Sequence, residues 1–394
     1  MLTGIAVILL AGLAMGRLFS KLKLPGLLGM MIAGMVLGPF CLDVIDGSVL
    51  QISGEIRQMA LVIILTRAGL SLTTDELKSV GRPAVLMCFV PACLEMLGVI
   101  LLAPALLDVS VAEAALIGSV IAAVSPAVVV PRMIRLMEEG YGQTRHIPQL
   151  VLAGASVDDV FVIVVFTALT GFLASGTADV LQVAGVPVSI ALGVLLGIAV
   201  GAAMLRVFRA FAMSDPVKVL ILLSISFLLL ETEDRLEGIL PVSGLLAIMS
   251  MGMLLRRKEE PLARRLSAIY NKLWLAAEVF LFVLVGAAVD LKYAAAAGLA
   301  AAALVAGAMV WRMGGVALSV AGTALTRKER LFCMVAYTPK ATVQAAIGAI
   351  PLSMGLACGN TALTVAVLSI LITAPFGAIC IDKLYRRLLD GPKN

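Results

Sequence analysis

The chain has 394 residues, of which 61% are hydrophobic and only 14% are charged. A soluble domain carries close to a quarter of charged residues, so the composition and the mean hydropathy of +1.08 exclude that class and indicate a membrane protein. The net charge of +5 follows from basic residues placed between apolar segments, and it implies no nucleic-acid partner.

Apolar segments recur along the whole chain, and each is long enough to cross a hydrocarbon core of roughly 30 Å as a helix. We therefore predict an all-α polytopic membrane protein, a single integral-membrane domain over 1–394. About thirteen transmembrane helices are expected, at residues 2–20, 24–40, 56–73, 83–106, 111–130, 147–173, 185–207, 217–231, 238–255, 270–290, 294–324, 330–355 and 361–386.

The connections between these segments differ sharply in basic residues. With this set of spans, 24 of the 30 Lys and Arg lie on one side of the membrane and 3 lie on the other. Cytoplasmic connections are enriched in Lys and Arg, so we expect the N-terminus outside and the C-terminus in the cytoplasm, in a cell inner membrane. The remaining three, Arg67, Arg312 and Lys340, lie within predicted helices.

The chain contains an internal repeat. GLLGMMIAGMVL at 26–37 resembles GLLAIMSMGMLL at 244–255, and ALVIILTRAGLSL at 60–72 resembles VFLFVLVGAAVDL at 279–291, with nearly equal offsets of 218 and 219 residues. Each helix of the first repeat pairs with the helix seven places later in the chain. Because seven is odd, the two paired helices cross the membrane in opposite directions. We predict two inverted five-helix repeats, at about 24–173 and 238–386, with the seventh helix linking the halves.

The repeat places a proline beside a hydroxyl residue in the same part of each half. Ser125-Pro126 lies in the fifth predicted helix, and Thr338-Pro339 lies in the twelfth. Proline removes a backbone donor and clashes with the preceding turn. Polar backbone freed in this way is tolerated in lipid only where it lines a cavity or packs in protein. We therefore predict two broken, crossing helices, with Ser125 and Thr338 as candidate ion-binding residues.

Several ionisable residues lie well within the predicted helices. Each costs about 2.5–3.5 kcal/mol on insertion scales, so each must be compensated or functional. The six residues are Glu95, Asp158, Asp159, Glu278, Arg312 and Lys340.

Asp158 and Asp159 are adjacent in the apolar run GASVDDVFVIVVF at 154–166. Neighbours on a helix diverge by about 100°, so one carboxylate can face an ion cavity while the other faces a basic partner. A carboxylate can hold either a proton or a hard monovalent cation, which makes this pair a candidate exchange site. The alternative is a solvated break between two short helices.

The other buried charges allow two interpretations each. Glu95 and Arg312 occupy equivalent positions of the repeat with opposite charge, so we expect an ion pair that either holds two helices or takes part in transport. Lys340 either neutralises helix C-termini at the break or takes part in proton exchange. Glu278 is expected to pack against a basic or hydroxyl group away from the ion ligands.

Other chemistries have little support in the sequence. The six cysteines show no CxxC spacing, and the one histidine, His146, lies in a connection and is expected to be solvated. No nucleophile–base pair is evident. We expect neither an enzyme nor a resident cofactor.

Together these motifs resemble the cation/proton antiporter superfamily, and within it the NHA-branch sodium/proton antiporters and their bacterial relatives. The resemblance covers essentially the whole chain. It rests on ASVDDV around Asp158 and Asp159, on TPKATVQAAIG at 338–348, on Glu95 in the fourth helix and on Arg312 in the eleventh.

The resemblance implies a role for each of these residues. Asp159 corresponds to the carboxylate that binds the ion and carries the proton, and Asp158 to its companion, so Na⁺ would bind at Asp159 and Asp158. Arg312 stands where many bacterial relatives have lysine, and arginine stays charged, so it is not expected to carry a second proton. In the NHA branch the corresponding arginine pairs with a helix-4 glutamate. If Glu95 occupies Arg312 in this way, Asp158 is freer to titrate.

The implied function is secondary antiport of Na⁺ or Li⁺ for H⁺ by an elevator movement, with the two ions competing at Asp159. A K⁺/H⁺ antiporter on the same fold is an alternative, because the sequence gives no cavity radius. A symporter for an organic anion on this fold is another, although such carriers lack the Asp-Asp pair.

The resemblance also implies an architecture. Core helices at 83–173 and 294–386 would move against scaffold helices at 2–73 and 217–290, and a homodimer would form through the scaffold. The expected partners are a monovalent cation, a proton and the lipid bilayer.

Overall fold

The computed structural model describes residues 1–71, 81–174, 180–236 and 242–391. Within these ranges every regular element is a helix, which confirms the predicted all-α class. Parts of the third and ninth predicted spans, 72–73 and 238–241, lie outside the described residues.

The chain packs as two compact units. The first comprises Met1–Gly54, Asp75–Leu173 and Leu281–Asn394, and the second comprises Glu55–Thr74 and Ala174–Phe280. The helices within residues 1–54, which were expected in the scaffold, thus pack in the same unit as the helices expected in the core. The functional division into core and scaffold stays a prediction.

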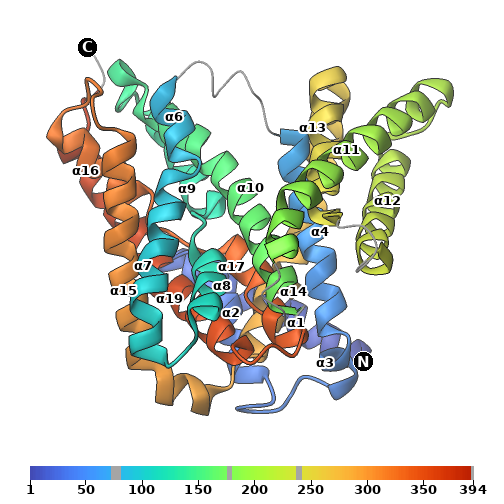
Figure 1. Ribbon diagram of the computed structural model, residues 1–394, viewed down its shortest axis with the longest axis horizontal. Helices are drawn as coiled ribbons and strands as arrows, with labels where there is room; N and C mark the ends of the chain where they lie inside the picture. The colour runs from blue at the N-terminus through green and yellow to red at the C-terminus, as the bar shows by residue number, and fades with distance from the viewer. Residues whose placement is uncertain (72–80, 175–179, 237–241, 392–394) are drawn as a thin grey trace. The chain divides into compact units, whose positions relative to one another are not determined.

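The first unit holds most of the helices (Figure 1). They are α1 (Leu2–Lys21), α2 (Gly26–Leu37), α3 (Gly47–Gln51), α6 (Arg82–Met87), α7 (Val90–Leu107), α8 (Val111–Ile121), α9 (Pro126–Glu138), a 3-10 turn (Gln143–Arg145), α10 (Ile147–Ala174), α15 (Leu291–Ser319), α16 (Arg327–Ala336), α17 (Thr342–Ile347), α18 (Ile350–Ser353) and α19 (Gly359–Leu388).

The second unit holds α4 (Ser53–Ser71), α11 (Val180–Ala210), α12 (Asp215–Leu236), α13 (Gly244–Lys258) and most of α14 (Glu260–Ala287). Glycines at every fourth position of α11 face α13; a Cβ on Gly193 would lie 2.6 Å from the Ser243 carbonyl oxygen. Small residues let two membrane helices approach at backbone distance. In the same unit Glu278 interacts electrostatically with Arg67, which agrees with the basic partner expected for it.

Each of the predicted spans corresponds to one helix or to consecutive helices. Among the described residues, 8 helices are long and apolar enough to cross a membrane, so helix length alone does not establish all the predicted spans. The breaks at Pro126 and Pro339 are confirmed. A further break was missed: the fourth predicted span divides into α6 and α7, because Pro91 in the first turn of α7 cannot continue the hydrogen bonds of α6.

Helices α7 and α15 pack side by side along much of their length (Figure 1). Two glycines permit this approach: a Cβ on Gly315 would lie 2.6 Å from the Pro91 Cα, and a Cβ on Gly98 would lie 2.5 Å from the Trp311 ring. Glu95 lies between Pro91 and Gly98 on the same face of α7. The close packing therefore brings Glu95 to the face of α15 that carries Arg312.

Candidate ion-binding site

The site is built on two helix breaks that cross. Helix α8 ends at Ile121 and α9 begins at Pro126, while α16 ends at Ala336 and α17 begins at Thr342. The Ser125 backbone N–H donates to the Pro339 carbonyl oxygen at 2.7 Å. The Gln344 side chain donates through Nε2 to the Ala123 carbonyl oxygen at 2.8 Å. The irregular backbone that proline imposes is thus satisfied by the opposite break.

Arg312 is fully buried and links the elements around this crossing. Its Nη1 donates to Glu95 Oε2 at 2.8 Å, and its Nη2 donates to Asp158 Oδ2 at 2.8 Å. Nε donates to the Tyr337 carbonyl oxygen at 2.7 Å, and Nη1 also donates to the Ala122 carbonyl oxygen. One guanidinium therefore binds two carboxylates and the backbone of both breaks.

The sequence left open whether Arg312 pairs with Glu95 or with Asp158, and the structure shows both ion pairs. Arg312 binds both carboxylates, because a guanidinium presents five donors in a fork and can serve two acceptors at once. Asp158 Oδ2 also accepts the Val124 backbone N–H at 2.7 Å. Asp158 is therefore held in place by a charged side chain and by the α8–α9 break.

Lys340 is the second fully buried cation. Its Nζ lies 2.6 Å from Glu95 Oε1 and donates to the Ile121 carbonyl oxygen at 2.5 Å. Ile121 is the last residue of α8, so Lys340 neutralises a helix C-terminus, as one of the two interpretations expected. Its pairing with Glu95 was not foreseen, because the repeat matched Glu95 to Arg312 only.

Asp159 is the carboxylate left over when these charges are paired. Arg312 and Lys340 balance Glu95 and Asp158, and all four side chains are fully buried. In the part of the chain that the structure describes, no cation lies within ion-pair distance of Asp159, and its buried Oδ1 has no hydrogen-bond partner. The residue as a whole stays partly exposed. The site therefore contains one partly exposed carboxyl group that no described cation neutralises.

Ser125 and Thr338 differ in whether their hydroxyl groups already make a hydrogen bond within the protein. The buried Ser125 Oγ makes no hydrogen bond with any described residue. Thr338 Oγ1 donates to the Val335 carbonyl oxygen at 2.8 Å and so caps the end of its own helix. Ser125 is thus the better placed of the two to offer an oxygen to a cation.

Sequence reasoning missed several residues that build the site. Tyr337 is buried, its hydroxyl donates to the Met87 carbonyl oxygen at 3.1 Å, and Arg312 lies over its ring at 5.2 Å. Thr373 Oγ1 accepts the Lys340 backbone N–H at 3.0 Å. Gln344 could have been predicted from the sequence, because it is a polar residue in the run TPKATVQAAIG within a predicted span. Nothing in the pattern around Thr373 distinguishes it from an ordinary helix threonine.

The crossing of two broken helices over a buried charge cluster is the arrangement of a secondary transporter. The model of the family "Sodium/hydrogen exchanger, transmembrane" matches residues 5–384. The chain belongs to this family, and it is a multi-pass membrane protein.

Relatives of known name cover almost the whole chain. Sodium/hydrogen exchanger 9B2 of Homo sapiens is 33% identical over an alignment 412 positions long, which covers 99% of this chain and 75% of that protein. The 9B2 exchanger of Mus musculus is 31% identical, over 100% of this chain and 75% of its own length. Sodium/hydrogen exchanger 9B1 of Homo sapiens is 29% identical, over 98% of this chain and 78% of its own length. All three are animal proteins, and none is a bacterial member of the branch.

The fold is also that of a solved structure. The sodium proton antiporter MjNhaP1 from Methanocaldococcus jannaschii superposes with a TM-score of 0.84 and 21% sequence identity, over 98% of this chain and 97% of that one. At this identity the likeness concerns the fold alone.

Proposed function

We propose that this chain is a secondary antiporter that exchanges Na⁺ or Li⁺ for H⁺, with cation and proton competing at Asp159. The observation that carries the proposal is the surplus carboxylate beside a cluster whose other charges are paired. An uncompensated charge within a membrane is costly. A proton or a monovalent cation each removes that cost, and one negative charge is fully neutralised by either, so binding of one opposes binding of the other.

Asp158 and Ser125 offer further oxygen atoms near Asp159, and Asp158 is held in a fixed position by its hydrogen bonds. Asp158 keeps Oδ2 on Arg312 and on the α8–α9 break, while its Oδ1 has no partner among the described residues. Ser125 Oγ lies in the same break. Hard cations prefer carboxylate, hydroxyl and carbonyl oxygens. We assign Asp159 as the exchanging carboxylate, with Asp158, Ser125 and Thr338 as candidate further ligands.

The charge network suits movement as one body. Arg312 and Lys340 tie α7, α8, α10, α15 and the α16–α17 break together inside the first unit. An elevator movement that exposes Asp159 to each side in turn is part of the proposal. So are a homodimer, an inner-membrane location with the N-terminus outside and the C-terminus cytoplasmic, and transport without a chemical reaction or a resident cofactor.

The test uses purified full chain in vesicles loaded with a pH-sensitive dye, with a proton gradient imposed and Na⁺, Li⁺ or K⁺ added. Asp159→Asn is expected to abolish cation-induced proton flux, because an amide binds neither ion as a counter-charge. Asp108→Asn is the matched control: Asp108 is exposed at the C-cap of α7 with φ 51°, a conformation that asparagine tolerates.

Full exchange by Asp159→Asn contradicts the assignment. Exchange by the wild type with K⁺ but not with Na⁺ or Li⁺ favours the K⁺/H⁺ alternative. Accumulation of a labelled organic anion without cation-induced proton efflux favours a symporter.

A further inference from the structure

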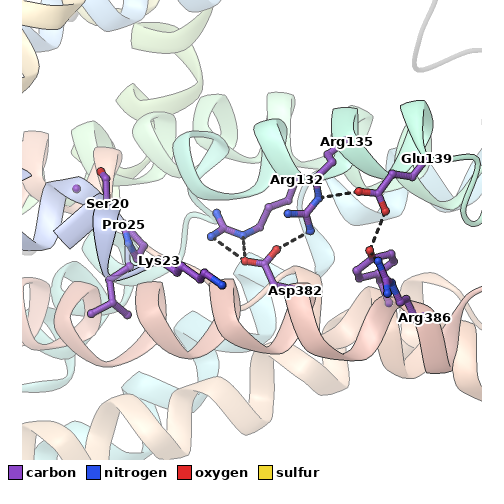
Figure 2. Close-up of a pocket in the computed structure, with 11 residues that line it drawn as sticks. Ser20, Lys23, Pro25, Arg132, Arg135, Glu139, Asp382 and Arg386 are labelled. Carbon is purple, nitrogen blue, oxygen red and sulfur yellow. Dashed lines mark hydrogen bonds and ion pairs between the residues drawn. The ribbon is translucent and has the colours of Figure 1, made fainter. Parts of the chain in front are cut away.

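A basic pocket lies at the ends of three elements of the first unit, and the exchange site described above uses none of its residues. The α1–α2 connection, the last turns of α9 and the C-terminal part of α19 form its walls. The cavity measures about 760 Å³. Its charged lining residues are Lys23, Arg132, Arg135, Glu139, Asp382 and Arg386 (Figure 2).

The two carboxylates of the pocket are taken by the arginines of α9. Arg135 Nη2 donates to Asp382 Oδ1 at 2.8 Å, and Arg132 donates to Asp382 Oδ2 at 3.3 Å (Figure 2). Arg135 Nε also lies 3.5 Å from Glu139 Oε1. Glu139 in turn accepts the Tyr385 hydroxyl at 2.7 Å. Four cations against two carboxylates leave an excess of two positive charges.

Lys23 and Arg386 carry this excess. No carboxylate in the described part of the chain lies within ion-pair distance of either residue. Arg386 is fixed at one end of the pocket, where its Nε donates to the Tyr385 hydroxyl at 2.9 Å. Figure 2 shows Lys23 reaching along α19 toward Asp382 from the other end. The surplus charge is therefore directed into one cavity from two sides.

The backbone at Lys23 gives an independent indication. Lys23 has φ 60° and follows the C-cap of α1, where the Leu24 N–H bonds to the Phe19 carbonyl oxygen. This left-handed position after a helix is usually glycine, because a Cβ makes it unfavourable. A lysine at a strained position that opens into a cavity indicates that the side chain is needed there.

We propose that this pocket binds a phosphate-bearing anion through Lys23 and Arg386, with Arg132 and Arg135 at its floor. Guanidinium groups match phosphate oxygens in geometry as well as charge. All three walls belong to the side of the membrane on which the basic connections predict the cytoplasm, and anionic phospholipids enrich that leaflet. A lipid headgroup and a free phosphate compound share this chemistry. The bound group would bridge the α1–α2 connection to α9 and α19, independently of cation exchange.

The test measures binding to the purified full chain in detergent by isothermal titration calorimetry. The probes are dihexanoyl phosphatidylglycerol, inorganic phosphate and dihexanoyl phosphatidylcholine. The variants are K23Q, R386Q and the double variant K23Q/R386Q. The matched control K21Q/R387Q removes the same charge from residues of α1 and α19 that are exposed outside the pocket.

Phosphatidylglycerol is expected to bind the wild type, about fivefold more weakly after loss of each pocket cation and about 25-fold more weakly in K23Q/R386Q. The control K21Q/R387Q should bind as the wild type does. Equal losses for inorganic phosphate indicate a free phosphate compound, and binding of phosphatidylglycerol alone indicates a lipid; both support the pocket.

The proposal is overturned if neither anion binds the wild type, or if K23Q/R386Q binds no more weakly than K21Q/R387Q. It is also overturned if zwitterionic phosphatidylcholine binds as tightly as phosphatidylglycerol. Thermal unfolding without ligand checks that each variant is folded. If K23Q/R386Q is unfolded, the affinities of the single variants K23Q and R386Q are compared with that of the wild type instead.

Discussion

Replacing Lys340 by methionine removes one of the two cations of the buried cluster while keeping an unbranched side chain of similar length. Lys340 Nζ lies 2.6 Å from Glu95 Oε1, and both side chains are fully buried. Removing one partner of a buried pair leaves an uncompensated charge and costs about 3–5 kcal/mol. At about 2 °C per kcal/mol, the Tm of K340M should fall by about 6–10 °C.

Adding Glu95→Gln to K340M restores the charge balance. Arg312 and Asp158 still form a pair at 2.8 Å, and the glutamine oxygen can still accept from Arg312. The double variant E95Q/K340M should therefore recover much of the lost stability, with a coupling energy of about 1–3 kcal/mol between the two sites.

The assay is thermal unfolding of the wild type, both single variants and the double variant, purified in the same detergent at the same pH. Lys383→Met, an exposed change on α19, controls for the loss of a lysine. Losses in E95Q and K340M that simply add in the double variant would refute the balanced-cluster account.

Three further predictions follow from the site. Competition at Asp159 predicts that the apparent affinity for Na⁺ falls as pH falls, by up to about tenfold per pH unit once the site is mostly protonated; vesicle assays across pH would contradict this if the KM for Na⁺ stayed constant. Gln344→Leu leaves the Ala123 carbonyl oxygen and a second backbone group unsatisfied, at about 1–3 kcal/mol each, and should lower the Tm; an unchanged Tm argues against the crossing. Gly154→Ala places a Cβ against the Tyr337 hydroxyl and should cost about 1–3 kcal/mol, partly relieved by Tyr337→Phe in a double-mutant cycle.

Much of the helical framework was predictable because the bilayer restricts which backbone structures can span it. A span must satisfy its own backbone hydrogen bonds, so apolar length predicts a helix, and proline predicts where the helix breaks. The breaks at Pro126 and Pro339 were found in this way. The break before Pro91 was missed because the apolar pattern continues through it, and the structure shows that α6 ends at Met87 and α7 begins at Val90.

The sequence by itself determined that this is an all-helical membrane protein, where its two principal breaks lie, and that Glu95, Asp158, Asp159, Arg312 and Lys340 fall within predicted spans. It did not determine how those charges pair. Pairing depends on distances of a few ångströms between helices more than 150 residues apart, and on how many donors one group directs at once. Only the tertiary structure decided that Arg312 binds both Glu95 and Asp158, that Lys340 completes the balance, and that Asp159 is the charge that remains.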